Sequence, residues 1–534
     1  MKLVAAAEMQ NIDKLASENY GIPGIVLMDQ AAKAVADVAL RQENFSDNSN
    51  GKIVVFCGKG NNGGDGFGAA RYLANAGLQT AVFLVNATFN DLQGDAALEA
   101  DMLRKAGIPI NSILTEEDLS FAEVKSLRAD LIIDAMLGTG FKGELRGLYK
   151  SVCSMINSLE KVVLAVDVPT GVDADFGTRA ENAIWADMTV TMALPKTGLL
   201  LYPGKENVGE LILADIGMPE KLLASCDSKK YLVTADDIAQ MLPIRKPNAH
   251  KGDAGRVVIA AGSPGFTGAA AMSAFAAVKA GGGLVSLLTP LSCRDILSTK
   301  LTEVMVHGLL ERMPGVLGGA AEGDILQRTA KADVLAIGPG LGTSENTTQV
   351  VLNILKNATK PVVIDADAIT AIKGNMNILP KMQVAKVLTP HPGEMARITG
   401  IDISVIDRER INVAAHYAKE WKATVVLKGA PTVVALPDGT TYLNPTGCPA
   451  MATGGSGDVL TGVLAALIAS GMPVEKAAVA AVYLHGLAGE IASEGEIGLA
   501  ASDIALAIPK ARKAIYEQED LQFSIYNTSL KMVK

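Results

Sequence analysis

The stretch that says most about this chain is Thr453-Gly454-Gly455-Ser456-Gly457-Asp458-Val459-Leu460-Thr461-Gly462. Its glycines at 454, 455 and 457 allow a tight backbone turn and leave room for a ligand. Val459, Val463 and Leu467 then recur every four residues, which predicts a helix with one apolar face. The turn therefore precedes a helix N-terminus, where free N–H groups and the helix dipole favour an anion such as phosphate.

Asp458 lies in the first turn of this predicted phosphate-binding helix. A bound phosphate would repel a carboxylate at that point, so Asp458 needs a different task. A carboxylate beside a phosphate can take a proton from a substrate hydroxyl. We therefore expect Asp458 to act as a general base.

The composition describes a chain of 534 residues, of which 49% are hydrophobic and 20% are charged. This length predicts at least two globular domains. The 48 basic and 57 acidic residues give a net charge of −9, and there is no basic cluster, so we expect no nucleic-acid partner. The longest apolar run, near residues 460–469, is too short to span a bilayer, so we expect no membrane partner.

The N-terminus and the cysteines predict a cytoplasmic protein. The apolar start is interrupted by Glu8, Gln10 and Asp13 before it reaches the length of a signal-peptide core. The five cysteines are far apart and form no CxxC pair, which is typical of reduced thiols. The five histidines have no metal-ligand spacing, so we expect no zinc site.

Apolar strands alternate with Ala-rich helices along the chain, which predicts an α/β class with mainly parallel sheets. The pattern lapses near residues 225–235, where we place a domain boundary, and the tail after Ile508 is expected to fray. Helical stretches are expected from Gly457 to about Glu494. The predicted strands are Lys52–Cys57, Asp130–Asp134, Val162–Asp167, Arg256–Ala261, Val334–Ile337, Val362–Asp365, Val387–Thr389 and Thr424–Leu427.

A second glycine-rich turn, residues 57–66, follows a predicted strand and opens a predicted helix over Phe67–Asn75. Strand, glycine turn and helix start together indicate a cradle for a phosphate or dinucleotide. The run is not GxGxxG, so it does not imply the usual Rossmann mode of dinucleotide binding. For Asn61 or Asn62 taken alone, helix capping is the simpler interpretation.

Three motifs in the first part of the chain carry a resemblance: GNNGGDG at 60–66, DAMLGTG at 134–140 and VDVPTGVD at 166–173. In this order they resemble the NAD(P)H-hydrate epimerase domain, which is the N-terminal half of bacterial bifunctional NAD(P)H-hydrate repair enzymes. The resemblance covers about residues 1–220 and implies a Rossmann-like three-layer α/β/α domain, which we place at residues 1–225.

The resemblance also implies which residues form the epimerase site. Asp167 would be the acid/base group at C6 of the hydrated nicotinamide, although a single aspartate before Pro169 could also only stabilise a turn. The expected ligands of a K+ ion are Asn62, Asp134 and Thr170. The expected substrate-binding residues are Asn61, Asn62, Gly63, Gly64, Asp65, Gly138, Thr139, Gly140, Phe141, Lys142, Gly143, Glu144, Tyr149 and Asp167.

Five motifs in the second part of the chain narrow the interpretation of Asp458: KGDAGR at 251–256, GPGLG at 338–342, HPGE at 391–394, KGAPT at 428–432 and ATGGSGD at 452–458. Together they resemble the ADP-dependent NAD(P)H-hydrate dehydratases, which are ribokinase-like α/β domains. We place this domain at residues 235–512. The resemblance implies that Asp458 deprotonates the C6 hydroxyl of the S-hydrate, which attacks the terminal phosphate of ADP. Loss of phosphate then restores NAD(P)H and leaves AMP.

This second resemblance implies a nucleotide site and a hydrate site, with Mg2+ accompanying ADP. The expected ADP-binding residues are Lys428, Gly429, Ala430, Pro431, Thr432, Thr453, Gly454, Gly455, Ser456 and Gly457. The expected hydrate-binding residues are Thr267, Gly340, His391 and Asp458. A solvated Lys428 and a purely structural His391 are the alternatives. Asp365 and Asp367 could bind a metal ion or water, or only cap a helix, and Cys448-Pro449-Ala450 departs from the pattern expected of the family.

Two other functions compete with the repair of hydrated NADH and NADPH. One is a ribokinase-like kinase for a vitamin precursor fused to a Rossmann-like domain, which would keep Asp458 and its glycines. The other is a binding scaffold for the first half, which is disfavoured because Asn62, Asp134, Asp167 and Thr170 are all present. Flat apolar faces on the Ala-rich helices favour a homo-oligomer.

Overall fold

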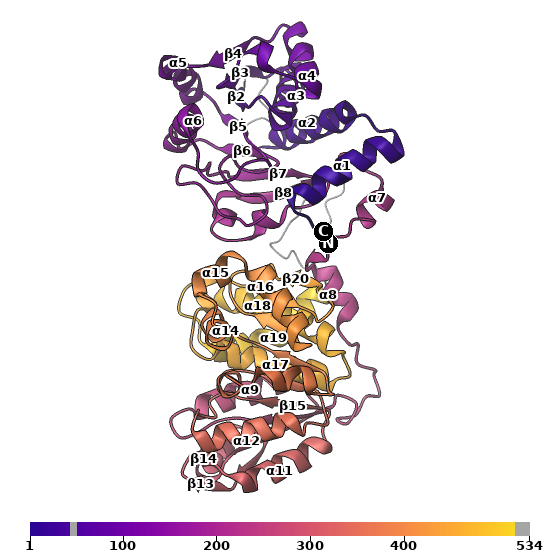
Figure 1. Cartoon of the computed structure of the whole chain (residues 1–534), viewed down its shortest axis with the longest axis vertical. Helices are drawn as coiled ribbons and strands as arrows, with labels where there is room; N and C mark the ends of the chain where they lie inside the picture. Colours follow the sequence, from indigo (N-terminus) through magenta and orange to yellow (C-terminus); the bar gives the residue numbers. More distant parts are fainter. Residues whose placement is uncertain (43–50, 518–534) are drawn as a thin grey trace. The chain divides into compact units, whose positions relative to one another are not determined.

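The structure is a computed structural model that describes residues 1–42 and 51–517 (Figure 1). The chain divides into two compact units, with the division between Ser228 and Lys229. Each unit is built on a mainly parallel sheet covered by helices, so the predicted α/β class is confirmed. No helix within the described ranges is long and apolar enough to cross a membrane.

The first unit contains a parallel sheet with the strand order β4-β3-β2-β5-β6-β7-β8. The strands are β2 (Lys52–Cys57), β3 (Gln79–Val85), β4 (Ile110–Ile113), β5 (Leu131–Ala135), β6 (Val163–Val166), β7 (Met188–Met192) and β8 (Glu210–Ala214). The strands β5, β6 and β7 are buried along their whole length, because helices cover both faces of the sheet.

Helices on the two faces of this sheet form two separate apolar cores, which gives the predicted three-layer arrangement (Figure 1). One core contains residues of α1 (Ala6–Tyr20), α2 (Gly24–Leu40), α3 (Asn61–Asn75) and α4 (Gly94–Lys105). The other contains residues of α5 (Glu116–Leu127) and α6 (Gly147–Ser158). The polar residues that follow β2, β5 and β6 therefore gather at one edge of the sheet, where parallel strands end.

The sheet of the second unit runs in the order β9-β20-β19-β18-β17-β16-β15-β10-β11-β12. From β18 to β12 all neighbours are parallel, whereas β19 pairs antiparallel with β18 and with β20. The strands are β9 (Lys230–Leu232), β10 (Arg256–Ala260), β11 (Leu284–Pro290), β12 (Met305–Leu309), β15 (Val334–Ile337), β16 (Val362–Ile364), β17 (Lys386–Leu388), β18 (Thr424–Leu427), β19 (Val433–Ala435) and β20 (Thr441–Leu443). The helices used below are α9 (Thr267–Lys279), α10 (Arg294–Lys300), α11 (Gly319–Ala330), α13 (Asp367–Ala371), α14 (Pro392–Thr399), α16 (Arg410–Trp421), α17 (Ser456–Ala469), α18 (Val474–Ser493) and α19 (Ala501–Glu517).

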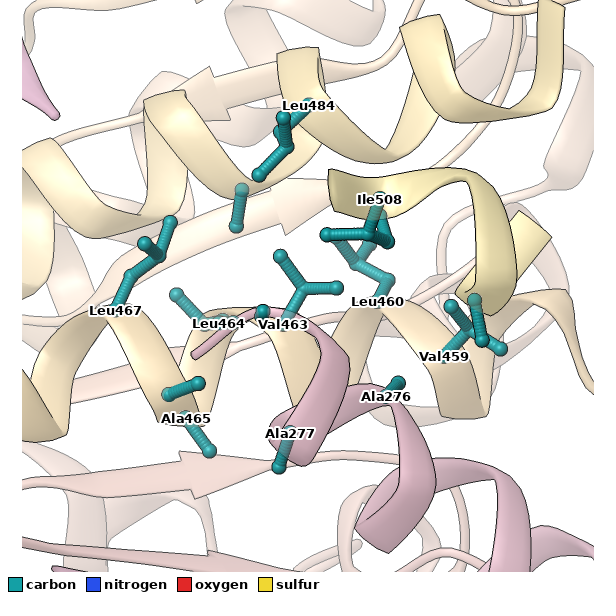
Figure 2. Packing of buried hydrophobic residues seen from close by; sticks show 14 of the residues in the cluster. Ala276, Ala277, Val459, Leu460, Val463, Leu464, Ala465, Leu467, Leu484 and Ile508 are labelled. Carbon is teal, nitrogen blue, oxygen red and sulfur yellow. The ribbon is translucent and has the colours of Figure 1, made fainter. Parts of the chain in front are cut away.

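Helix α17 is buried on every side, not only on the single apolar face that its sequence predicted. Every residue from Val459 to Ala469 is buried. Figure 2 shows why: Ala276 and Ala277 of α9, Leu484 of α18 and Ile508 of α19 surround the helix. A helix enclosed by three others has no solvent face, so its small and apolar residues continue around the axis. The predicted phosphate-binding turn is therefore attached to a rigid central helix.

The end of the second unit differs from its prediction. Helix α19 continues past Ile508 to Glu517, and Ala511, Ala514 and Ile515 are buried on it. The expected fraying was wrong up to Glu517, because the charged residues there occupy only the exposed side of an amphipathic turn. The tail beyond residue 517 lies outside the described residues.

Candidate active sites

The first site begins at the glycine-rich run between β2 and α3, where the strand and the helix are found as predicted. The helix begins six residues before the predicted Phe67, so residues 61–66 belong to it and only residues 58–60 form the turn. Helix α3 starts at Asn61 with Gly60 as its N-cap and has no side-chain cap. The capping interpretation of the two asparagines is therefore wrong. A Cβ atom on Gly63 would lie 1.8 Å from the carbonyl oxygen of Gly58, so only glycine allows this tight turn. The first amides of α3 have no partners within the helix and face a ligand site.

This turn opens onto a cavity of about 1110 Å3. Of the predicted epimerase-site residues, Asn61, Asn62, Asp65, Gly138, Thr139, Gly140, Phe141, Lys142, Glu144, Tyr149 and Asp167 line it. Gly63, Gly64 and Gly143 do not line it, because Gly63 and Gly64 pack beneath the turn. Segments that are far apart in the sequence thus form one cavity.

Asp134 and Thr170, two of the predicted K+ ligands, are buried and contact each other directly. The Oγ1 atom of Thr170 donates to Oδ1 of Asp134 at 2.7 Å, and the amide of Thr170 donates to Oδ2 at 2.7 Å. Burial raises the pKa of Asp134 to about 6, although these hydrogen bonds lower it. A cation next to this carboxyl would favour its ionised form.

The third predicted ligand, Asn62, lies beside Gly138. The residue before Gly138 is Leu137, and its amide donates a hydrogen bond to the hydroxyl of Thr170. Its Nδ2 atom is buried and has no hydrogen-bond partner in the described part of the chain. Turning the amide by half a rotation would place an oxygen there instead. One carboxylate with neutral oxygen donors suits a hard cation of single charge, so the residues fit K+.

Asp167 follows β6 and forms an ion pair with Lys196, in which Nζ lies 2.5 Å from Oδ1. The hydroxyl of Thr191 and the amide of Met192 donate to the same oxygen at 3.1 and 3.3 Å. Lys196 is 1% exposed, whereas the Asp167 side chain is 15% exposed. One carboxylate oxygen is therefore held by three donors, and the side chain still reaches the cavity.

The backbone at Asp167 is also unusual, with a φ angle of +62°. This left-handed conformation is uncommon for residues other than glycine, although aspartate tolerates it better than most. It costs free energy and persists where the surrounding structure imposes it, commonly at functional sites. The conformation supports the interpretation of Asp167 as more than a turn residue.

The second site is formed at the N-terminus of α17, with Gly455 as the N-cap at a φ angle of +95°. Asp458 is the third residue of this helix. Burial, and then the charge of Asp365, raise the pKa of Asp458 to about 7, while Lys428 lowers it. A general base works best when its pKa is close to the pH of the reaction, so Asp458 is suited to that task.

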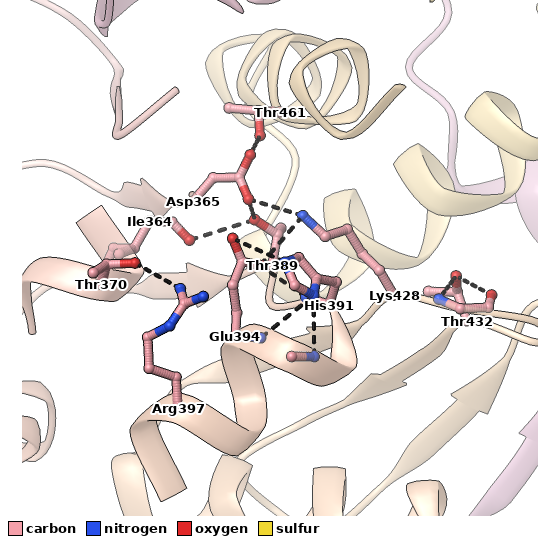
Figure 3. A network of polar contacts seen from close by, with 12 residues as sticks. Ile364, Asp365, Thr370, Thr389, His391, Glu394, Arg397, Lys428, Thr432 and Thr461 are labelled. Carbon is pink, nitrogen blue, oxygen red and sulfur yellow. Dashed lines mark hydrogen bonds and ion pairs between the residues drawn. The ribbon is translucent and has the colours of Figure 1, made fainter. Parts of the chain in front are cut away.

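Lys428 follows β18, and its ammonium group lies beside Asp365 (Figure 3). Its Nζ atom lies 3.0 Å from Oδ1 of Asp365 and 3.8 Å from Oε2 of Glu394. A Cβ atom on Gly457 would lie 3.2 Å from Nζ, so the ammonium group is beside the glycine turn. Burial lowers the pKa of Lys428, but the charges of Asp365 and Glu394 outweigh this effect and raise it. Lys428 is therefore a protonated lysine fixed by Asp365 and Glu394, and the interpretation as a solvated lysine is wrong.

Asp365 and Asp367 do not cap α13, since its N-cap is Ala366 and has no side-chain bond. Asp365 is 1% exposed and accepts hydrogen bonds from Thr389 and Thr461, each at 2.7 Å, in addition to its contact with Lys428 (Figure 3). Asp367 accepts from the amide of Gly342 at 2.8 Å. Asp365 thus joins three strand ends to α17, and Asp367 fixes the loop that contains Gly340.

The predicted hydrate-binding residues occupy two places. Thr267 is the first residue of α9, and Gly340 packs against Phe266, the residue before it. Thr267 and Gly340 therefore lie close to each other. His391 caps α14: its Nδ1 atom accepts from the amides of Gly393 and Glu394 at 3.0 and 3.4 Å (Figure 3). This structural task fixes the ring, and Nε2 lies 3.7 Å from Oε1 of Glu394.

Comparison with known proteins agrees with this division into two sites. Residues 24–198 match the family model described as YjeF-related protein N-terminus, and residues 257–510 match the model described as NAD(P)H-hydrate dehydratase. The bifunctional NAD(P)H-hydrate repair enzyme of Moorella thermoacetica is 44% identical over 520 residues, which are 97% of this chain and 98% of that protein. The chain belongs to the bifunctional NAD(P)H-hydrate repair enzyme family.

Another member of this family, from Thermofilum pendens, is 38% identical over the whole length of both proteins. Among solved structures, an ADP/ATP-dependent NAD(P)H-hydrate dehydratase from Bacillus subtilis, co-crystallised with ATP/Mg2+, is 30% identical. It covers 53% of this chain and 98% of its own, with a TM-score of 0.47.

Sequence reasoning missed several residues of this family member's two sites. Lys196 and, on α1, Asp13 line the first cavity. In the second site, Arg410 donates to the carbonyl oxygen of Pro431 at 2.7 Å and packs under Gly429, and His485 lies 3.4 Å from the Ser456 hydroxyl. The sequence did mark Lys196, since it is the single charged residue in the apolar stretch 188–201. No sequence pattern marked Asp13, Arg410 or His485 as site residues.

The departure at Cys448-Pro449-Ala450 lies in a segment anchored on α18. The amide of Gly447 donates to Glu490, and Thr446 donates to the carbonyl oxygen of Tyr483. Cys448 lies 3.5 Å from the hydroxyl of Ser493. Cys448, one of the residues that depart from the family pattern, therefore contacts α18 at the start of the loop that leads to Thr453.

Proposed function

We propose that the chain repairs hydrated NADH and NADPH in two steps. The first domain, residues 1–225, interconverts the R and S hydrates, and the second, residues 235–512, dehydrates the S form at the expense of ADP. Relatives that match along the whole chain are bifunctional repair enzymes, so a vitamin-precursor kinase is not favoured. The two activities act in sequence on one pool of damaged cofactor.

In the epimerase step Asp167 acts as acid/base at C6 of the hydrated ring. Three donors, one of them the Lys196 ammonium group, hold its Oδ1 atom and so fix the carboxyl at the wall of the cavity. The cavity side chains and the α3 amides bind the rest of the substrate. Asn62, Asp134 and Thr170 would hold K+, which would supply a fixed positive charge beside the site.

In the dehydratase step Asp458 takes the proton of the C6 hydroxyl as its oxygen attacks the terminal phosphorus of ADP. The bond to the bridging oxygen breaks, and AMP leaves with that electron pair. The phosphate ester at C6 is then eliminated as inorganic phosphate, and loss of a proton from C5 gives the C5–C6 double bond of NAD(P)H. The amides at the α17 N-terminus and the Lys428 ammonium stabilise charge on the phosphate; one such donor is often worth about 3–4 kcal/mol.

The charges around Asp458 fit a divalent cation that arrives with the nucleotide. Asp365, Asp367 and Glu394 each raise the pKa of Asp458, and Lys428 alone lowers it. Mg2+ is commonly held by one or two carboxylates together with the phosphate oxygens of a nucleotide. Mg2+ bound to ADP would neutralise charge on the phosphate being transferred.

The observation that supports the proposal most is the position of Asp458, a carboxyl with a pKa of about 7 at the start of a phosphate-binding helix. The test mixes the full-length chain with the S-hydrate of NADPH, ADP and Mg2+. We expect the absorbance of reduced nicotinamide to rise with equal amounts of AMP and phosphate. A stable phosphorylated product without NADPH would instead indicate a kinase.

A second experiment tests the epimerase step in the same full-length chain. Pure R-hydrate with ADP should be consumed only after conversion to the S form, so Asp167→Asn should stop its repair and leave S-hydrate repair intact. Repair of R-hydrate at the normal rate in this variant would contradict the assignment. The use of ADP over ATP, a homo-oligomeric state and a cytoplasmic location stay predictions.

A further inference from the structure

The epimerase cavity contains more carboxyl groups than its buried lysine can balance. Asp13 of α1, Asp65 of α3 and Asp167 all line it, and Lys196 is the buried cation among them. Asp13 and Asp65 are both close enough to Asp167 and Lys196 to respond to their charges. Three carboxylates around one ammonium group would repel one another, so the group favours keeping protons on some of its members.

Lys196 forms its ion pair with Asp167. Its ammonium group donates to Asp167 at 2.5 Å, to the hydroxyl of Thr191 at 3.2 Å and to the carbonyl oxygen of Met192 at 3.1 Å. An ammonium group has three N–H donors, so all of them are used. Asp13 and Asp65 have no ion pair or side-chain hydrogen bond with any residue in the ranges 1–42 and 51–517. Of the three carboxyls, Asp167 is therefore the one that is paired with the cation.

We propose that Asp13 is a second catalytic carboxyl of the epimerase site and that it carries the proton that Asp167 lacks. This inference rests on the proposed epimerase function and deepens it. Inversion at C6 needs an acid to release water and a base to accept a proton when water returns. A neutral and an ionised carboxyl in one cavity provide this pair.

The step balances without any further reagent. Asp13 gives its proton to the C6 hydroxyl, the C6–O bond breaks, and water leaves with the bonding electrons while the N1 lone pair forms an N1–C6 double bond. Water then adds to the other face of C6, Asp167 takes a proton from it, and the electron pair returns to N1. The reverse direction uses the two carboxyls in exchanged tasks. The pair holds one proton before and after the step, and both carboxyls are ionised while C6 is part of the cationic N1–C6 double bond.

Asp13 suits this task better than Asp65. Asp13 is exposed to the cavity, so it can exchange its proton with water between turnovers, whereas Asp65 is partly covered and lies near Glu99. Desolvation of its carboxyl within the cavity raises the pKa of Asp13 to about 6; Lys196 lowers it, and the charge of Asp167 raises it further. The pKa of Asp65 is raised well above the usual range, which makes Asp65 a fixed neutral group. The other charged or titratable side chains that line the cavity are Lys14, Lys59, Asp95, Lys142, Glu144, Arg146 and Tyr149.

The test measures the rate of R to S interconversion by the full-length protein against pH, for the wild type and Asp13→Asn. Asparagine keeps the shape of the side chain but carries no exchangeable acid proton. We expect the rate to fall by about 10²- to 10⁴-fold, as for removal of other general acids. The wild-type rate should fall on the alkaline side as the pair loses its proton, and this fall should disappear in the variant.

Glu18→Gln is the matched control, because Glu18 is an exposed carboxyl on the same helix and pairs with Lys14. It should leave the rate and the pH profile unchanged. Thermal unfolding of both variants, followed by circular dichroism, reports whether the first unit folds, because dehydration takes place in the other unit. An Asp13→Asn enzyme that epimerises within threefold of the wild type with the same alkaline fall would overturn the inference. Absence of epimerisation in the wild type would instead refute the proposed function.

Discussion

The Nζ atom of Lys428 lies 3.0 Å from the Oδ1 atom of Asp365, a carboxylate that is 1% exposed and also accepts from Thr389 and Thr461 (Figure 3). The loop after β18, the ends of β16 and β17, and α17 are thereby joined at one carboxylate. This contact directs the lysine toward Gly457, where the nucleotide phosphate is expected.

Asp365→Asn should weaken nucleotide use more than it lowers the maximum rate. The amide cannot pair with Lys428 as a charge, so the ammonium group loses its fixed position, and misplacement of a binding group can cost up to about 10²-fold. We expect KM for ADP to rise by about tenfold, measured in the dehydration of S-hydrate. Asp295→Asn, at an exposed carboxyl on α10, is the control. Equal KM values in the two variants would contradict an anchoring task for Asp365.

Asp458→Asn should abolish dehydration and change the pH dependence of stability. The wild-type rate should rise with pH through about 7, because the base must be ionised, and the variant should lose at least about 10²-fold. The pKa of Asp458 is raised in the folded state from 3.8 to about 7, so the folded state binds this proton more tightly. Its stabilising effect is complete below about pH 4 and is lost as the pH rises toward about 7.

The asparagine variant should therefore be more stable than the wild type at about pH 8 and should lose this advantage near about pH 4. Urea unfolding at the two pH values measures the difference. A stability difference that does not depend on pH would show that the carboxyl is not held with a raised pKa.

Lys196→Met should reduce epimerisation, because the ammonium group that holds Oδ1 of Asp167 is lost. We expect the rate of R to S interconversion to fall by up to about 10²-fold, as for other misplaced catalytic groups. The change also leaves a largely buried carboxylate without its partner, which typically costs about 3–5 kcal/mol of stability. The double variant Lys196→Met with Asp167→Asn should recover much of that stability but no activity. A double variant as unstable as the single one would point to lost packing instead.

Gly462→Ala tests the close contact between α9 and α17. A Cβ atom at this position would lie 2.1 Å from the carbonyl oxygen of Ser273 and 2.9 Å from the Cβ atom of Ala276, so one helix must move. We expect a loss of about 1–3 kcal/mol, as for other overpacked cores, together with slower dehydration. Gly323→Ala is the control: it lies within α11 with open space around it and should stabilise by about 0.5–1 kcal/mol.

The strand, turn and helix at both glycine-rich runs were predictable because they depend on neighbouring residues. Strands β2, β15 and β18 have the predicted bounds, since their apolar runs end at polar or glycine residues. Helix α17 was predicted to have one buried apolar face, whereas it is buried on all sides. Periodicity reports which positions are apolar, but it does not report how many other helices enclose them.

By itself, the sequence determined the α/β class, the two glycine turns and the candidate acids Asp167 and Asp458, because backbone turns and helix starts are encoded locally. Only the tertiary structure decided which groups meet those acids. Lys196 and Asp13 approach Asp167 from β7's loop and from α1, and Asp365 reaches Lys428 from another strand. Such contacts follow from strand order and helix packing, which local sequence patterns do not encode. The contacts in turn determine which charged groups surround each carboxyl.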